Sequence, residues 1–475
     1  MKKNSPAMRS FRLVCTREQI PLVEDLLGAQ GFRFESEPFS PVARRLTHEP
    51  LPLGSSLAAM FGYIYIQDRS SMLPPLMLNP PPGAAVLDMC ASPGSKTGFL
   101  GQLVGRTGFA LGNEPSKARL ATLRRNLQLL NLFCCCTCSY PGEKLPLRAA
   151  SWDRIQLDPP CSGWGTAEKN PQVLQLWQGD KVKPLIALQR RLLAEAARLL
   201  APGGCLVYST CTTNTEENEE QLRYALNELG LEFMPLTPPP GFAFADPACP
   251  EFAGALRVAT GEDGQGFFVA LLGKPEHGDA TRAQAGPEQG CAPPPAPKES
   301  DAGLQGGVFV RPWEKESRFV GERRRHGKAG DRKKHESGMV EELPRSILEE
   351  AYADQALLPE GRIAVFNGVP HFLPKASGEL LPQNFVWKGF PLGKIGKGGE
   401  FRLSPHLRGL MPDAPSARKQ GLSMLDLDDP ALLLPLLQGQ SLPAGQTAGE
   451  IGLYFRGLPL CRLTVKGSRA MLSPR

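Results

Sequence analysis

The sequence of 475 residues contains no apolar run of roughly 18 residues or more, so no segment is predicted to span a membrane. No apolar stretch or cleavage site follows the charged start Met1–Ser5, so secretion is not expected. The twelve cysteines do not predict a disulfide scaffold, because three of them, Cys134–Cys136, are consecutive and could hardly all pair. These absences favour a reducing compartment, the cytoplasm.

Metal sites and the common nucleotide sites are also disfavoured. The cysteines at 134–136 and Cys138 lie on an apolar run with no histidine near them, so we expect small buried side chains rather than a metal site. The loop Asp88–Thr97 matches neither GxxxxGK[ST] nor GxGxxG, which disfavours nucleoside triphosphates and dinucleotides. The region Gly62–Lys274 contains no histidine, which disfavours hydrolases that pair a cysteine with a histidine.

What the sequence does contain is an alternation of short apolar strands and amphipathic helices from Gly62 to about Lys274. This alternation is typical of an α/β fold with a parallel sheet. Within it, the predicted strand Ala85–Leu87 is followed by a turn and a helix from about Ser95. The spacing of leucines predicts another helix over Lys117–Leu130, with Asn131 as its stop.

Composition divides the chain into four regions. We predict a small N-terminal unit over 1–60, the α/β unit over 61–274, a Pro- and Gly-rich and then basic linker over 275–345, and a small β-rich unit over 346–475. The basic tract Arg311–His335 holds ten Lys or Arg and four Asp or Glu. Such a tract suits a phosphate backbone, although most charge runs are only solvated.

Two segments of the α/β unit suggest a cofactor site at the carboxyl ends of strands, where open parallel sheets bind ligands. In the first, small residues let a ligand approach the backbone, and the helix start favours a carboxylate. Its members are Cys90, Ala91, Ser92, Pro93, Gly94, Ser95 and Lys96. In the second, Glu114 can accept both ribose hydroxyls of a nucleoside. Taken alone, the first could be an ordinary loop and the second a surface carboxylate.

Two further segments each place a cysteine at the same edge. In Asp158–Gly163, paired prolines fix the backbone and direct Cys161 at the cleft. In Tyr208–Thr212, Cys211 follows a buried strand. A lone cysteine is usually a small buried side chain, but two at one edge of a sheet point to chemistry.

In this order, the segments Asp88–Thr97, Asp158–Gly163 and Ser209–Cys211, followed by Glu216–Glu219, resemble the motif set of the RNA 5-methylcytosine methyltransferases. The resemblance covers roughly residues 60–274. It implies a Rossmann-like core that depends on S-adenosylmethionine, preceded by a small N-terminal RNA-binding segment.

The C-terminal part resembles the family more loosely. Segments such as Gly389–Gly393 and Arg456–Leu460 are similar to the PUA-like, RNA-binding extension of the bacterial ribosomal RNA members. The resemblance therefore implies an RNA substrate, with ribosomal RNA favoured and tRNA possible, and a monomeric protein.

The resemblance also implies roles for single residues. It makes Cys90–Lys96, Glu114 and Asp158 the cofactor-binding residues, Cys211 the nucleophile and Cys161 the residue that aids release. The sequence departs from the family in two respects. Serines stand at positions 92 and 95, where the family often has Ala and Gly, and no acid around Pro141 matches the one that the family offers to adenine.

The chemistry explains why a cysteine is needed. Carbon 5 of cytosine is too poor a nucleophile to attack a methyl sulfonium directly, whereas addition of a thiolate at carbon 6 turns the ring into an enamine. Asp158 is placed to assist at ring nitrogen 3. Because the core contains no histidine, the general base must be Asp158, a thiolate or water. Because free cysteine has a pKa of about 8.5, Cys211 needs activation by its surroundings.

Three other functions remain open. Asp158-Pro159-Pro160 also resembles the [DN]PP[YF] turn of enzymes that methylate exocyclic amines, but Cys161 stands where those enzymes have an aromatic residue. DNA cytosine-5 enzymes use the cysteine of the Pro-Cys turn as nucleophile, which would be Cys161, whereas the additional Cys211 fits the RNA group. A non-catalytic RNA-binding scaffold is the third.

Overall fold

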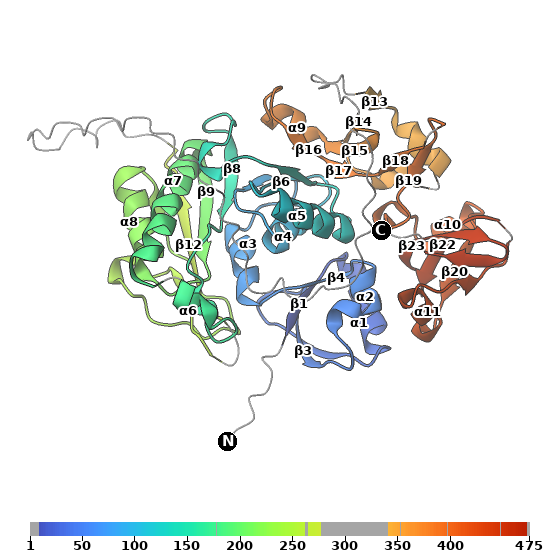
Figure 1. The fold of residues 1–475 in the computed structure, drawn as a ribbon, viewed down its shortest axis with the longest axis horizontal. Coiled ribbons are helices and arrows are strands. Elements are labelled where there is room, and N and C mark those ends of the chain that lie inside the picture. The colour runs from blue at the N-terminus through green and yellow to red at the C-terminus, as the bar shows by residue number, and fades with distance from the viewer. Residues whose placement is uncertain are drawn as a thin grey trace, which may run out of the picture.

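The computed structural model describes residues 9–176, 178–261, 265–276, 341–351, 353–396, 398–446 and 448–472. Within them the chain forms a central sheet with helices on both faces, an N-terminal unit, and further small sheets from the C-terminal part (Figure 1). The basic tract Arg311–His335 and nearly all of the predicted linker 275–345 lie outside the described residues. No helix among those described is long and apolar enough to cross a membrane.

The central sheet has nine strands. Eight follow one another in the order β10 (Glu232–Met234), β12 (Phe267–Gly273), β9 (Leu200–Thr210), β8 (Trp152–Leu157), β5 (Ala85–Asp88), β6 (Phe109–Asn113), β7 (Cys135–Cys138) and β16 (Trp387–Lys388). The ninth, β11 (Leu256–Val258), pairs with β12.

Strand direction differs between the middle and the edges of this sheet. The five strands from β9 to β7 are parallel, whereas β10, β12 and β16 pair antiparallel to their neighbours. The predicted parallel sheet is therefore confirmed from β9 to β7 and wrong for β10 and β12, whereas β16 comes from outside the region of that prediction. The reason is that an apolar run buries its side chains in either direction, so its sequence does not fix its direction.

Helices cover both faces because successive residues of a strand point to opposite sides. Val86 of β5 packs in one cluster with residues of α3 (Leu73–Leu78), α4 (Ser95–Val104) and α5 (Lys117–Leu130). The next residue, Leu87, packs on the other face with residues of α7 (Lys183–Leu199) and α8 (Glu219–Glu228). The short α6 (Gln172–Leu176) precedes α7.

The helix predicted over Lys117–Leu130 has these bounds in the structure. The Ser116 hydroxyl accepts a hydrogen bond from the Arg119 N–H at its start, and Asn131, with φ +59°, ends it. The cysteine run at the following strand is also as expected, since four thiols are buried there: Cys134, Cys135, Cys136 and Cys138.

The N-terminal unit is a four-stranded antiparallel sheet with two helices. Its elements are β1 (Ser10–Leu13), α1 (Ile20–Gly28), β2 (Arg33–Ser36), β3 (Ala43–His48), α2 (Leu57–Met60) and β4 (Ile64–Ile66). Because β4 pairs with β1, this sheet takes a strand from beyond residue 60.

The C-terminal part forms three small sheets and short helices. The first contains β13 (Glu341–Leu343), β14 (Gly361–Phe366), β15 (Val369–Pro374) and β17 (Phe390–Pro391), and the second β18 (Gly393–Ile395) and β19 (Phe401–Leu403). The third contains β20 (Met424–Leu427), β21 (Leu442–Pro443), β22 (Ala448–Phe455), β23 (Leu458–Lys466) and β24 (Arg469–Met471). The helices are α9 (Lys375–Leu380), α10 (Ala414–Lys419) and α11 (Leu434–Leu437).

The two ends of the chain share one hydrophobic core. Phe11 and Leu26 of the N-terminal unit lie in the same cluster as Leu433, Phe455 and Leu463 of the C-terminal part, and all five are fully buried. The C-terminal part therefore packs on the rest of the protein and is not an isolated appendage.

Candidate active site

The four segments singled out in the sequence meet at the carboxyl edge of the central sheet. Asp88 is the last residue of β5 and Asn113 the last of β6, whereas Asp158 follows β8 and Cys211 follows β9. These strands are parallel neighbours from β9 to β6, so their carboxyl ends point the same way. The structure thus brings together the site that the sequence predicts there.

The two cysteines are in direct contact. Cys161 Sγ lies 3.3 Å from Cys211 Sγ, and either thiol can be the donor of this hydrogen bond. The bond with Cys211 and burial raise the pKa of Cys161 well above the usual range of a thiol. At neutral pH Cys161 therefore keeps its proton and can donate it to the sulfur of Cys211.

Asp158 lies beside this pair with both carboxylate oxygens engaged. Its Oδ2 accepts a hydrogen bond from Lys96 Nζ at 2.8 Å, and its Oδ1 accepts one from Ser209 Oγ at 2.9 Å. These bonds connect the loop after β5, the turn after β8 and strand β9, so the orientation of Asp158 is fixed from two sides.

Glu217 joins the two cysteine-bearing turns, a role that sequence reasoning missed. Its carboxylate is fully buried and accepts hydrogen bonds from the Ser162 N–H and from Gln189 Nε2, both at 2.9 Å, and from Asn214 Nδ2 at 3.2 Å. Ser162 follows Cys161 directly, and Asn214 lies three residues after Cys211. Only the run of polar residues Glu216–Glu219 marked this region in the sequence.

Asp88 holds the loop that precedes α4. Its Oδ2 accepts hydrogen bonds from Thr97 Oγ1 at 2.6 Å and from Gln156 Nε2 at 3.2 Å, and its Oδ1 accepts one from the Cys90 N–H at 3.4 Å. Burial raises the pKa of Asp88 to about 6. Through these hydrogen bonds Asp88 therefore holds the loop Cys90–Lys96 in place.

The groups around this loop fit S-adenosylmethionine. The start of α4, with Gly94 at φ +106°, presents free backbone N–H groups to a carboxylate, and Lys96 adds a cation. Glu114, only 2% exposed, is held after β6 by the Ser116 N–H at 2.9 Å and by Arg119 at 3.3 Å, where its oxygens suit ribose hydroxyls.

Two further contacts brace this site from distant parts of the chain. Arg12 of β1 is fully buried and bonds Gln102 and the Ser95 carbonyl, and burial lowers its pKa to about 9. After β7, the ring of Tyr140 stacks on that of Phe385 at 4.9 Å. Neither contact could be found from the sequence, since both partners lie far apart in the chain.

A hollow of about 290 Å³ lies beside the cysteine turns. Trp164 and Thr213 line it, and Gly165 N–H donates to the Cys211 carbonyl at 3.1 Å at its wall. Trp164 Nε1 is buried and has no hydrogen-bond partner among the described residues. The hollow thus has an aromatic ring in its wall, close to the turn that follows Cys211.

Comparison with known proteins points to one family. Residues 75–273 match the family described as 16S rRNA methyltransferase RsmB/F. The ribosomal RNA small subunit methyltransferase F of Cronobacter sakazakii is 36% identical over 278 residues, which are 57% of this chain and 57% of that protein. The protein of the same name from Shewanella halifaxensis is 33% identical over 290 residues, 57% of this chain and 59% of that protein.

A solved methyltransferase structure is also similar to this chain. A methyltransferase homologue from Pyrococcus horikoshii is 33% identical, with a TM-score of 0.50, and the match covers 57% of this chain and 87% of that one. This chain spans just over half the length of the curated relatives that it matches.

Proposed function

Since this chain belongs, through residues 75–273, to the RsmB/F family of rRNA methyltransferases, we propose that it methylates carbon 5 of cytosine in RNA, most specifically ribosomal RNA. The central sheet is its Rossmann-like core, and S-adenosylmethionine is its cofactor. The observation that carries the proposal is the 3.3 Å contact between Cys161 and Cys211 at the cofactor edge.

Cofactor binding is assigned to the residues around the start of α4. The cofactor supplies an electrophilic methyl group. Cys90–Lys96 would hold its amino-acid end through backbone N–H groups and Lys96, and Glu114 would accept hydrogen bonds from the ribose hydroxyls. Asp158 closes the site from the side of β8, next to the cysteines.

Cys211 is the proposed nucleophile. Its sulfur adds to carbon 6 of the cytosine, which makes carbon 5 able to take the methyl group. Once nitrogen 3 has taken a proton from water, the Asp158 carboxylate accepts a hydrogen bond from it and so stabilises the ring. The support for Cys211 over Cys161 is that the raised pKa of Cys161 keeps the proton on that thiol, which can donate a hydrogen bond to the sulfur of Cys211.

Cys161 is proposed to finish the reaction. Once Cys211 Sγ is bonded to carbon 6 it carries no charge, and the main cause that raises the pKa of Cys161 is removed. Cys161 can then give its proton to water and, as a thiolate, accept the proton on carbon 5, while the bond between Cys211 and carbon 6 breaks and its electron pair returns to Cys211 Sγ. The base must be unpaired or flipped out to reach the pair, and the hollow at Trp164 suits such a base.

The alternatives differ in which residue they require. A tRNA substrate leaves this chemistry unchanged, whereas DNA-type chemistry exchanges the two cysteines. Amine methylation requires neither thiol, and an RNA-binding scaffold requires no cofactor. A reducing compartment such as the cytoplasm is part of the proposal, and the free thiols of all eleven described cysteines support it.

To test this, Cys161 and Cys211 are each replaced in the full chain, and the transfer of labelled methyl groups from S-adenosylmethionine to a small-subunit rRNA transcript is measured. Cys211→Ala should lower methyl transfer by about three orders of magnitude or more, because the nucleophile is lost. Cys161→Ala should methylate but stall, and so accumulate a covalent protein–RNA species on a denaturing gel.

The control is Cys205→Ala, which removes a thiol in the middle of β9, away from its carboxyl end, and should leave turnover unchanged. The double change at 161 and 211 should remove the covalent band. If Cys161→Ala gives no band and Cys211→Ala does, the roles are reversed. Full turnover by Cys211→Ala would refute the proposed chemistry.

A further inference from the structure

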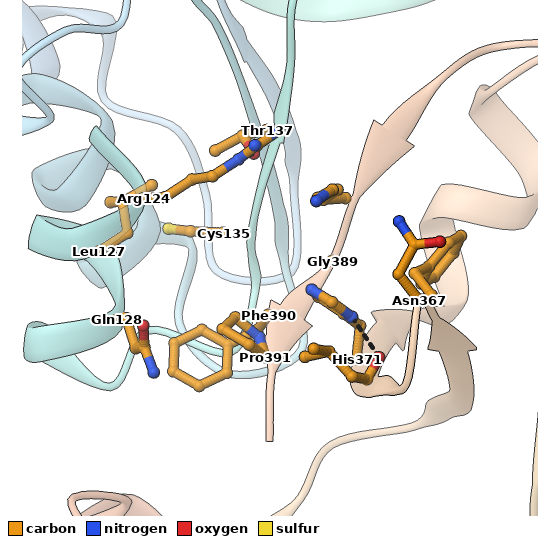
Figure 2. A pocket seen from close by; sticks show the side chains of 13 residues that line it. Arg124, Leu127, Gln128, Cys135, Thr137, Asn367, His371, Gly389, Phe390 and Pro391 are labelled. Carbon is orange, nitrogen blue, oxygen red and sulfur yellow. Dashed lines mark hydrogen bonds between the residues drawn. The ribbon is translucent and has the colours of Figure 1, made fainter. Parts of the chain in front are cut away.

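A second hollow, away from the cysteines, lies where the methyltransferase core meets the C-terminal part. Its volume is about 250 Å³. Arg124 of α5 and Thr137 of β7 lie on one side, and Asn367 and His371 of the first C-terminal sheet lie on the other (Figure 2). Neither part of the chain makes this hollow alone, so we call it the junction pocket.

Two cations, Arg124 and Lys388, line the junction pocket. Arg124 Nε donates to Thr137 Oγ1 at 2.9 Å. Lys388 of β16 is the antiparallel partner of Thr137 in β7, so its side chain lies on the same face of the sheet. Among the described residues, the terminal nitrogens of Arg124 and the Nζ of Lys388 have no hydrogen-bond or ion-pair partner. Both cations therefore keep donors for a ligand.

No acid balances these cations, since none of the residues that line the junction pocket is Asp or Glu. Burial and, second, the charge of Arg124 lower the pKa of Lys388. Burial lowers the pKa of His371 first, and Lys388 and Arg124 lower it further, whereas a hydrogen bond to the Val369 carbonyl raises it. The two cations thus repel each other in a partly desolvated place, and a bound anion would relieve that repulsion.

The remaining groups fit a nucleotide rather than a bare ion. His371 Nδ1 bonds the Val369 carbonyl at 2.8 Å, so in the neutral ring Nε2 is an acceptor, which suits a ribose hydroxyl. The Asn367 amide lies at the tip of the β14–β15 hairpin. Leu127 and Pro391 supply apolar walls. The volume lies just below the ~300 Å³ at which ligand pockets begin, so one nucleotide unit fits better than a larger ligand.

We propose that the junction pocket binds a backbone phosphate of the RNA substrate through Arg124 and Lys388, at a position a few nucleotides from the target cytosine. This inference rests on the proposed function and adds to it a site for the substrate. From β9, which carries Cys211, to β7 there are four strand spacings, or ~19 Å at ~4.8 Å each. RNA that reaches the cysteines can therefore reach the junction pocket a few nucleotides away.

The test measures binding, which does not depend on methyl transfer. Fluorescent single-stranded RNA is titrated into the full chain with Arg124→Gln, Lys388→Gln or both changes. Each change should weaken binding several-fold. The double change should also reduce the slope of log affinity against log salt by about 0.7, because about 0.7 is lost for each phosphate contact to a single strand and the pocket holds one phosphate.

Arg125→Gln is the matched control. Arg125 is the next residue of the same helix and is exposed, and its replacement changes the net charge by the same amount. It should leave affinity and salt slope nearly unchanged, and the affinity for S-adenosylmethionine should be that of the unaltered chain in all variants. Thermal unfolding of each variant shows whether it is folded. The Gln variants keep most of the side-chain volume, and Arg124→Lys, which keeps the charge, should retain most of the affinity.

Several outcomes would overturn the inference. Equal RNA affinity and salt slope in the double variant and the unaltered chain would do so. A second such outcome is that adenosine monophosphate or inorganic phosphate stabilises the unaltered chain but not the double variant, while both proteins bind RNA with equal affinity. The pocket would then bind a free ligand and not the RNA backbone. If the chain methylates RNA but the pocket variants bind RNA as well as the unaltered chain does, only this inference is refuted. If the pocket variants bind RNA more weakly but the unaltered chain transfers no methyl group, only the proposed function is refuted.

Discussion

Among single residues, Glu217 shows how the catalytic turns are held in register. A carboxylate accepts hydrogen bonds only, and the groups around Glu217 donate them. Glu217→Gln would turn an NH₂ group toward these donors, so we expect a loss of about 1–3 kcal/mol in the free energy of unfolding. Because the turns carry Cys161 and Cys211, kcat should fall by about 10- to 100-fold.

The neighbouring Glu216→Gln is the control for this prediction, because Glu216 is exposed. It should change neither stability nor kcat measurably. A positioning role further requires that the affinity of Glu217→Gln for S-adenosylmethionine stays near that of the unaltered chain. Equal kcat for both variants in a methyl-transfer assay would contradict the role.

Asp88 gives the protein a pH dependence opposite to that of most carboxyl groups. Burial raises its pKa from 3.8 to about 6, so the folded state holds this proton more tightly than the unfolded state does. Stability contributed at this site is complete below about pH 4 and is lost as the pH rises to about 6, by about 3 kcal/mol in all.

We therefore expect the neutral variant Asp88→Asn to gain stability relative to the unaltered chain as the pH rises from 4 to 6, with a constant difference above that. Urea unfolding of both proteins at several pH values measures the difference. A difference that stays flat from pH 4 to pH 7, or that changes in the opposite direction, would contradict the prediction.

The sequence predicted Glu114, Asp158 and Cys211 because each comes directly after a strand of recognisable pattern, and Cys161 because it follows one within the same turn. It did not predict the role of Glu217, since four consecutive polar residues look alike in the sequence, and only the fold shows that three of them are buried and that Glu217 contacts both turns. The pKa of Asp88 was equally out of reach, because it depends on burial by residues from other parts of the chain.

At the scale of elements, the short strand β16 attaches the C-terminal part to the core. It pairs with β7 through Trp387 and Lys388. Just before it, the Val386 N–H donates to the Tyr140 hydroxyl at 2.7 Å, and the Phe385 ring stacks on Tyr140. A strand of two residues has no periodic pattern, so the sequence could not predict this pairing, whereas the long amphipathic helix α5 was predictable to its ends.

Phe385 should therefore be the main anchor of this attachment. Its side chain is 6% exposed and lies in the core cluster that contains Leu192 of α7. Phe385→Ala should lower the free energy of unfolding by about 3–5 kcal/mol, as is usual for a buried phenylalanine. The adjacent Val386, 74% exposed, is the control, and Val386→Ala should stay within about 0.5 kcal/mol. Similar denaturant midpoints for the two variants would show that β16 carries little of the attachment.

At the scale of the whole molecule, the shared core makes the ends of the chain depend on each other. Tyr63 donates its hydroxyl hydrogen to the Pro459 carbonyl, and Asp25 pairs with Arg456 at 3.1 Å. Removing the chain after Lys274 would expose the core residues that Leu433 and Phe455 cover. Such a truncation would therefore report on folding as well as on RNA binding, and single substitutions are the better probe of how the parts cooperate.

Arg408 is the residue at which three parts of the molecule meet. Its guanidinium is buried and donates to the carbonyls of Val14, Gly62 and Leu130, at 3.1, 2.8 and 3.4 Å. It also lies 4.2 Å from the centre of the Tyr63 ring. Burial lowers the pKa of Arg408, and Tyr63 beside it opposes this shift. One side chain from the C-terminal part thus satisfies buried carbonyls of both the N-terminal unit and the core.

Arg408→Ala should leave these carbonyls without a donor and so lower the free energy of unfolding by about 3 kcal/mol or more. Because the lost bonds join the parts of the chain, we also expect faster proteolysis at their junctions under native conditions. Arg402→Ala is the matched control, since Arg402 is exposed and pairs only with the nearby Glu400 among the described residues, and it should cost less than about 1 kcal/mol. If both variants unfold at the same denaturant concentration and resist protease equally, the parts are held together by the apolar core alone, and Arg408 contributes nothing to their cooperation.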